Sequence, residues 1–251
     1  YQELIEFYIS NEIQLISQQI GKEKNNILNM YRMSPKLASL RSLPEEQQQK
    51  QMQFIYDTIA IKRLKATTPV LNMLNTKYVI TNKAIAPVEN TNKNGNCWFV
   101  EKLKPVGSAN KEMLALKEID LKKEAVVPSS QIKKSSWVKD SQDSIYMTSY
   151  GTNKISYSSV SKSALPAIFS EIYYPDGWNC YVDGKKVETF RANYVLRGAI
   201  IPAGKHKIEW KFEPQTFYTA STISLIGSIL LFLGCGFVFG SSAKKRFSLK
   251  A

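Results

Sequence analysis

The stretch that decides the fold is Phe217–Phe239, FYTASTISLIGSILLFLGCGFVF, which contains no charged residue over 23 positions. A helix of that length is about 34 Å long, which is enough to cross the hydrocarbon core of a bilayer. Phe217 and Tyr218 at its start are rings of the kind that lie at the membrane interface. We therefore predict one transmembrane helix over residues 215–240.

The charges on the two sides of this predicted helix differ. The segment 241–251 holds three lysines and one arginine without an acidic residue, whereas the lysines before the helix alternate with Glu209 and Glu213. The positive-inside rule therefore predicts a basic cytoplasmic tail at 241–251 and an extracytoplasmic position for residues 1–215. The first residues, YQELIEFYISNEIQ, have neither the basic nor the apolar region of an export signal, so we expect further membrane helices upstream of Tyr1.

Composition restricts the classes of partner. The chain has 251 residues, 43% of them hydrophobic, and a net charge of +13. This length and composition allow one or two folded domains beside the membrane helix. The basic residues are scattered as single lysines or pairs, which argues against nucleic acid and fits anionic lipid headgroups or an acidic envelope polymer equally well.

Cysteine and histidine usage limits the chemistry. Cys235 lies inside the predicted span, and Cys97 and Cys180 are open to two interpretations, a disulfide or two buried thiols. The only histidine, His206, is too little for a histidine-rich metal site or for a conventional catalytic triad with a spare base. We expect no metal site and no cofactor.

Hydrophobic periodicity predicts an α+β fold in two parts. Residues 1–135 have the mixed pattern of an α/β layer with a small sheet. Its expected elements are an amphipathic helix at 1–20, a polar irregular stretch at 21–41, a helix starting at 44–46, a helical segment at 70–75, strands at 77–81 and 97–103, a helix at 111–119 and a strand at 125–127.

Residues 136–214 change to a period of two, which predicts an antiparallel β-sandwich. Between Tyr181-Val182 and the next lysines, Asp183-Gly184 is typical of a type I′ hairpin. Asp176 likewise precedes glycine, and we interpret both aspartates as turn residues. Seven strands are expected, at 144–150, 154–159, 164–173, 178–182, 186–191, 194–201 and 206–212.

The block at 170–214, SEIYYPDGWNCYVDGKKVETFRANYVLRGAIIPAGKHKIEWKFEP, carries a combination of turn and strand motifs that can be compared with a known family. It resembles the C-terminal segment of the YfhO family of multi-pass bacterial membrane proteins, in which YYPxGW, VDGKxV, RANYxxR and PAGxHxI motifs precede a final membrane helix. YQELIEFYIS, LNMLNTKYVI and NGNCWFV, further upstream, are also similar to that family.

This resemblance implies a polytopic membrane protein similar to lipid-carrier-dependent glycosyltransferases of the GT-C type, which modify envelope polymers. In such enzymes the catalytic acids lie in early extracytoplasmic loops, so we expect none of the catalytic residues in this chain. The implied partners are the lipid bilayer, the upstream membrane helices, a lipid-linked sugar and an envelope glycopolymer. The alternative hypothesis is a non-catalytic module that braces a membrane domain or docks an envelope partner.

Substrate-binding candidates lie in the most distinctive block. The rings of this block can form a sugar-stacking surface, although rings at alternating strand positions are more often core. The two arginines can clamp an anionic group or pair across strands with Glu188 or Glu171, and the histidine can bind a ligand or only a neighbouring residue. The candidates are Tyr174, Trp178, Arg191, Asn193, Arg197 and His206.

Overall fold

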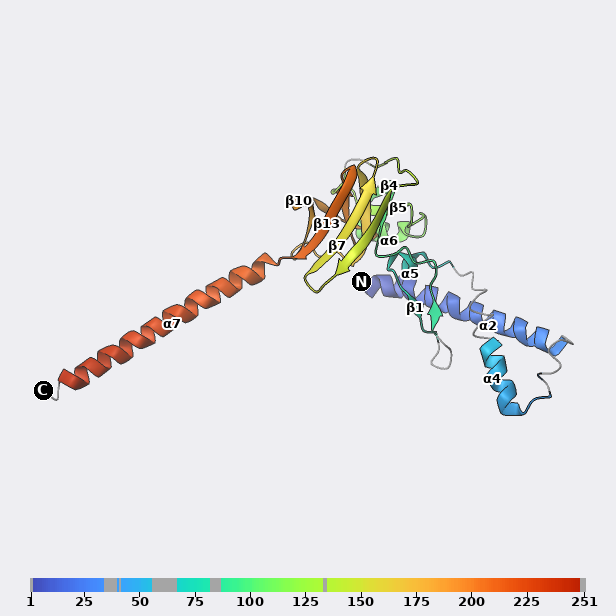
Figure 1. Ribbon diagram of the computed structural model, residues 1–251, viewed down its shortest axis with the longest axis horizontal. Helices are drawn as coiled ribbons and strands as arrows, with labels where there is room; N and C mark the ends of the chain where they lie inside the picture. Colours follow the sequence, from blue (N-terminus) through green and yellow to red (C-terminus); the bar gives the residue numbers. More distant parts are fainter. Residues whose placement is uncertain are drawn as a thin grey trace.

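The computed structural model describes residues 2–33, 40, 42–55, 67–81, 87–132 and 135–248, and the element bounds below refer to these residues. The fold is α+β, as predicted: a two-sheet body is covered on one side by helices and short strands, and a long helix projects from it (Figure 1).

The body is an antiparallel β-sandwich. Its first sheet has five strands in the order β10-β9-β13-β7-β6, and its second sheet has four in the order β11-β12-β8-β3. The first sheet consists of β6 (Ser144–Tyr150), β7 (Lys154–Ser161), β9 (Trp178–Val182), β10 (Lys185–Val187) and β13 (Gly204–Phe212). The second consists of β3 (Cys97–Phe99), β8 (Leu165–Ile172), β11 (Thr189–Ala192) and β12 (Leu196–Ile201).

The core between the sheets is built by alternate residues of the facing strands. Phe169 of β8 meets Tyr157 of β7 edge to face, with ring centroids 4.8 Å apart, and Trp210 of β13 at 5.3 Å. Such ring pairs contribute about 0.5–1.5 kcal/mol each beyond the area that they bury. Cys97 and Cys180 also lie in this core, and both are free thiols.

A mixed α/β layer covers the outer face of the second sheet, where Ile168, Phe190 and Leu196 join a second core. Glu12, which is buried, accepts hydrogen bonds from the backbone amides of Val70 and Leu71 and so caps a neighbouring short helix. The layer contains α1 (Gln2–Leu4), the π-helix η1 (Ile5–Ile9), α2 (Ser10–Met33), α5 (Pro69–Met73), β1 (Tyr78–Val79), β2 (Val88–Glu89), β4 (Lys102–Val106), α6 (Ala109–Ala115) and β5 (Glu124–Pro128). Helix α4 (Glu45–Ile55) lies apart from the sheets, near the far end of α2 (Figure 1).

Helix α2 is longer than predicted. The polar stretch at 21–41 was expected to be irregular, and this was wrong for residues 21–33, because the helix continues through Gly21 to Met33. The turn expected at Ser34-Pro35 lies outside the described residues. Ile16, Ile20 and Ile27 are buried at helical spacing, so one apolar stripe extends past the glycine. No atom would lie within 4 Å of a Cβ at Gly21, and a glycine in a helix interior costs only about 1 kcal/mol.

Two predicted strands are divided in the structure. The strand expected at 186–191 is β10 in the first sheet and β11 in the second, because Val187 packs into the core between the sheets while Phe190 packs into the second core. The strand expected at 97–103 likewise separates into β3, which pairs with β8 in the sandwich, and β4, which pairs with β5 in parallel.

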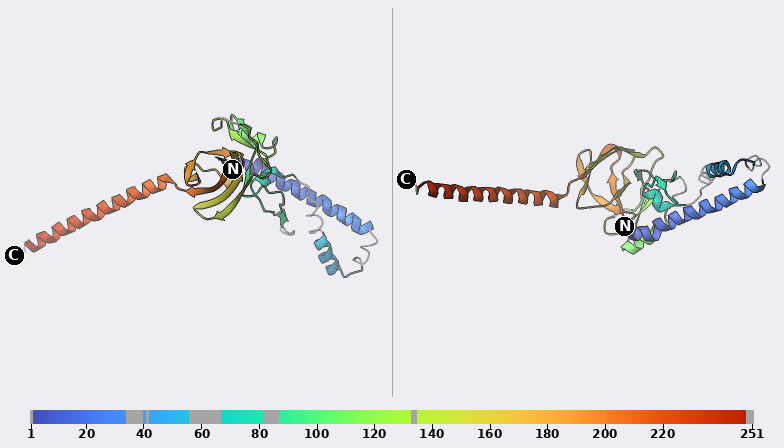
Figure 2. Two further views of the ribbon diagram at one scale, coloured as in Figure 1. Left: turned by 45° about the horizontal axis from the view of Figure 1, so that its top comes forward. Right: turned by 90° about the horizontal axis from the view of Figure 1, so that it is seen from below.

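Helix α7 (Gln215–Ser248) contains the predicted span. Its segment Gln215–Phe237 is long and apolar enough to cross a membrane, and its apolar window is not buried in the protein. Only Glu213 and Pro214 separate it from β13, and it projects from one end of the sandwich, away from α2 (Figure 2).

Candidate functional site

Three turns meet at the end of the sandwich from which α7 departs. We call this the α7 end, and it comprises residues 151–153, 173–177 and 193–195. The amide of Phe212 donates to the carbonyl of Asn153, and the amide of Glu213 donates to the carbonyl of Gly177 at 2.6 Å. These bonds tie the first two turns to the last residues before the helix.

An open groove lies between the second and third of these turns. It has a volume of about 530 Å³, within the range of small-ligand sites. We call it the Tyr173 groove, and it is lined by Ile172, Tyr173, Pro175, Arg191, Tyr194 and Val195. Two phenol rings and a guanidinium in one groove suit a polar, ring-shaped ligand with a negative charge.

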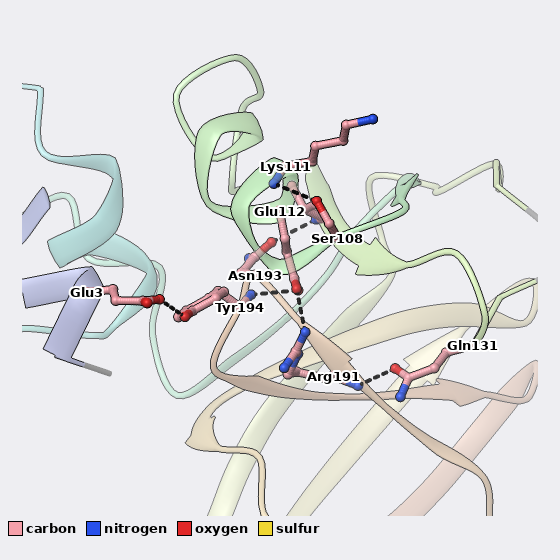
Figure 3. A network of polar contacts seen from close by, with 9 residues as sticks. Glu3, Ser108, Lys111, Glu112, Gln131, Arg191, Asn193 and Tyr194 are labelled. Atoms are coloured by element: carbon pink, nitrogen blue, oxygen red, sulfur yellow. Dashed lines mark hydrogen bonds and ion pairs between the residues drawn. The ribbon is translucent and has the colours of Figure 1, made fainter. Parts of the chain in front are cut away.

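Glu112 of α6 accepts a hydrogen bond from Arg191, the arginine that lines this groove (Figure 3). Its carboxylate lies 2.7 Å from Nη2 of Arg191 and also accepts the amide of Tyr194 at 2.9 Å. Burial raises the pKa of Glu112, and the charge of Arg191 opposes that rise. The arginine side chain is 33% exposed, so its outer part remains open to a ligand.

Asn193 is a structural residue. It has a positive φ of 48° and no exposed surface. Its amide donates to the carbonyl of Val126 at 2.8 Å, and its Oδ1 accepts the amide of Val126 at 2.9 Å. The turn is thus hydrogen-bonded to β5 in the α/β layer, and Asn193 positions the groove without lining it.

Arg197 and Trp178 pack inside the sandwich near the α7 end. The guanidinium of Arg197 lies 4.2 Å from the ring centroid of Trp178 and 5.2 Å from that of Trp210. Its Nε donates to the carbonyl of Ile172 at 2.8 Å, and burial lowers its pKa. Because Arg197 is only 3% exposed, it stabilises the end of the sandwich by cation–π contacts and is closed to a substrate.

Tyr174 is half exposed on the turn beside the groove but does not line it. Its carbonyl accepts the amide of Trp178 at 3.2 Å. A Cβ at Gly177 would lie 2.3 Å from the ring of Phe212 and 2.9 Å from that of Tyr174, which explains the glycine at this position.

His206 lies at the other end of β13, about 20 Å from Phe212 along the strand. Its Nδ1 is 2.6 Å from the carboxylate of Asp183, and its Nε2 is 2.9 Å from the carbonyl of Ala203. The hydrogen bond to Asp183 raises the pKa of His206, and the pKa of Asp183 is lowered in turn. Asp183 and Gly184 have φ values of 49° and 81°, which confirms the predicted type I′ turn.

The buried carboxylates among the described residues all hold the fold together. Glu12 and Glu112 accept the hydrogen bonds described above, Asp143 accepts the amides of Asp140 and Lys162, and Glu209 is surrounded by lysine side chains. Within the described ranges no three acids, cysteines or histidines are placed to hold a metal ion.

The structure thus brings five of the six sequence candidates to the α7 end and leaves His206 apart, but only Arg191 lines the groove. Sequence reasoning mentioned Glu188 as a strand partner for Arg191, whereas the partner in the structure is Glu112, 79 positions away. Tyr173 and Tyr194, which the sequence analysis interpreted as core rings rather than as site residues, also line the groove. The asparagine of the RANY motif was the available sequence signal for a turn between β11 and β12, and both Asn193 and Tyr194 have positive φ in the structure.

Comparison with known proteins gives one family. Searches of curated proteins and of solved structures found no significant match. The sequence profile described as "Bacterial membrane protein YfhO" matches residues 12–224, which include most of the α/β layer, the sandwich and the start of α7. The chain therefore belongs to the YfhO family of bacterial membrane proteins.

Proposed function

We propose that residues 1–215 form an extracytoplasmic domain of a polytopic membrane protein similar to lipid-carrier-dependent glycosyltransferases. The Tyr173 groove would orient the substrate, a lipid-linked sugar or the envelope glycopolymer that receives it. The catalytic residues would lie in membrane-domain loops outside this chain.

The observation that carries the proposal is the position of the groove. It opens at the α7 end, close to the point where the chain reaches its candidate membrane span. A lipid-linked ligand presents its sugar at the membrane surface, so a groove at this end can meet it. The rings of Tyr173 and Tyr194 offer stacking surfaces, and the exposed part of Arg191 offers charge.

The test is sugar transfer by the full-length protein in isolated membranes. We expect Tyr173→Leu to lower incorporation of labelled sugar into envelope polymer by about threefold to tenfold, the worth of one aromatic contact. Leucine keeps an apolar side chain at this partly buried position. Tyr146→Leu is the matched control, because Tyr146 is 57% exposed on β6 and does not line the groove.

Equal transfer by wild type and Tyr173→Leu, at matched membrane levels, would contradict the substrate role. A second function would then be favoured, that of a structural module bracing the membrane domain. The hydrogen bonds from Glu112 and Asn193, which join the α/β layer to the sandwich, support that alternative. It predicts that Tyr173→Leu and Tyr146→Leu alter activity only as far as they alter stability.

A further inference from the structure

Three lysines on the outer face of the first sheet share one carboxylate. Lys154 and Lys207 lie 2.7 and 2.9 Å from Oε1 of Glu209, and Lys211 lies 3.4 Å from Oε2. The ammonium groups of Lys154 and Lys207 hold the pKa of Glu209 down at about 2. One negative charge is thus shared among three positive charges, and the lysines are gathered at one place on the sheet.

Repulsion among the lysines offsets part of the stability that their ion pairs with Glu209 provide. Lys154 of β7 lies directly opposite Lys211 of β13, and like charges at such positions destabilise a sheet. Lys205 and Lys186 are exposed on the same face, and Glu213 is its second acid. The face therefore carries three more positive than negative charges. Lys205, Lys207 and Lys211 follow β13 for about 20 Å, and Lys154 of β7 and Lys186 of β10 lie beside them.

The face is also uncovered among the described residues. Ile208 and Trp210 point into the core between the sheets, so the residues alternating with them point outward. The α/β layer packs on the second sheet instead. Hydroxyl and amide groups flank the lysine row, from Ser156, Ser158, Asn179, Tyr181 and Ser149.

We propose that this face, the β13 lysine face, binds a linear polymer that carries a negative charge on each repeat. A row of cations along a strand matches a chain of anions better than a single anion. A bilayer is the less suitable partner. Figure 1 shows the first sheet face on and α7 in the plane of the picture, so the sheet is roughly parallel to the axis of α7. If α7 crosses a membrane, the β13 lysine face would be roughly perpendicular to the membrane surface and would not lie flat against the lipid headgroups. The inference is separate from the Tyr173 groove and needs no transfer activity.

The experiment measures binding of sodium polyphosphate to the 251-residue chain in zwitterionic nanodiscs, with dextran as the uncharged polymer. We expect Lys154→Gln/Lys207→Gln to weaken binding about tenfold, since each exposed ion pair is worth up to about fivefold. Glu209→Gln should bind at least as tightly as wild type. Lys111→Gln/Lys122→Gln, which removes the same charge from exposed positions of the α/β layer, is the matched control and should bind like wild type.

Equal weakening by the two double variants would overturn the proposal, because net charge alone would then explain binding. Equal binding of dextran and polyphosphate would overturn it too. Binding of phosphatidylglycerol vesicles as tight as that of polyphosphate, with the same dependence on Lys154 and Lys207, would assign the face to a lipid surface and refute a polymer partner. Melting temperatures of all variants establish that they are folded.

Discussion

Replacement of Asn193 is the sharpest test of how the α7 end is held together. Its side chain accepts the amide of Val126, and both residues have no exposed surface. Asn193→Ala would leave that amide without an acceptor, at a cost of about 1–3 kcal/mol. Alanine at a φ of 48° adds strain of about 1 kcal/mol. We expect a total loss of about 2–4 kcal/mol.

Asn193→Gly separates these two effects. Glycine loses the same hydrogen bond but adopts the positive φ without strain, so it should be about 1 kcal/mol more stable than the alanine variant. The assay is thermal unfolding of the chain in detergent micelles, where each kcal/mol corresponds to about 2–4 °C. An alanine variant that melts within 1 °C of wild type would refute the structural role. If Asn193→Ala remained as stable as wild type but lost sugar transfer, Asn193 would be a substrate-binding residue instead.

Three further predictions concern other contacts. Arg191→Ala should destabilise the protein by about 3–5 kcal/mol, because it leaves the buried carboxylate of Glu112 unpaired. Chemical denaturation should show that Arg191→Gln/Glu112→Gln is more stable than Arg191→Ala, because the double variant leaves no unpaired buried charge. Since the pKa of His206 is raised and that of Asp183 lowered, their contact should stabilise the fold most between about pH 4 and 6.5. The advantage of wild type over His206→Gln should disappear as pH rises through the raised pKa, and unfolding midpoints at pH 5, 7 and 9 measure it. Gly198→Ala should cost about 1–3 kcal/mol in a melting assay, because its methyl group would lie 2.2 Å from a phenylalanine ring carbon.

Local chemistry made much of the fold predictable. Strands β6 and β9 have the bounds expected from alternation, and Asp183-Gly184 forms the expected turn, because glycine and aspartate select a hairpin geometry without help from distant residues. The apolar run of α7 is equally local. Elements with such signals are visible in the sequence.

Contacts between distant elements were not predictable in the same way. The ion pair between Glu112 and Arg191 joins α6 to a hairpin, and nothing in the spacing of either residue indicates the other. The pairing of β3 with β8 also depends on which core each strand joins. For this reason the sequence analysis expected the arginine to pair with Glu188 or Glu171. In the structure Arg191, a predicted ligand-binding residue, pairs with Glu112 and so also has a structural role.

The proposed function requires that residues 1–215 lie on the outer side of the membrane. The most direct measurement is labelling of introduced cysteines in intact bacteria with a membrane-impermeant maleimide, in the full-length protein with Cys235 replaced by serine. Cys97 and Cys180 are buried and should stay unlabelled. We expect Tyr174→Cys to be labelled in intact cells, whereas Lys250→Cys should be labelled only after permeabilisation. Labelling of Lys250→Cys in intact cells, with Tyr174→Cys protected, would contradict the proposed function.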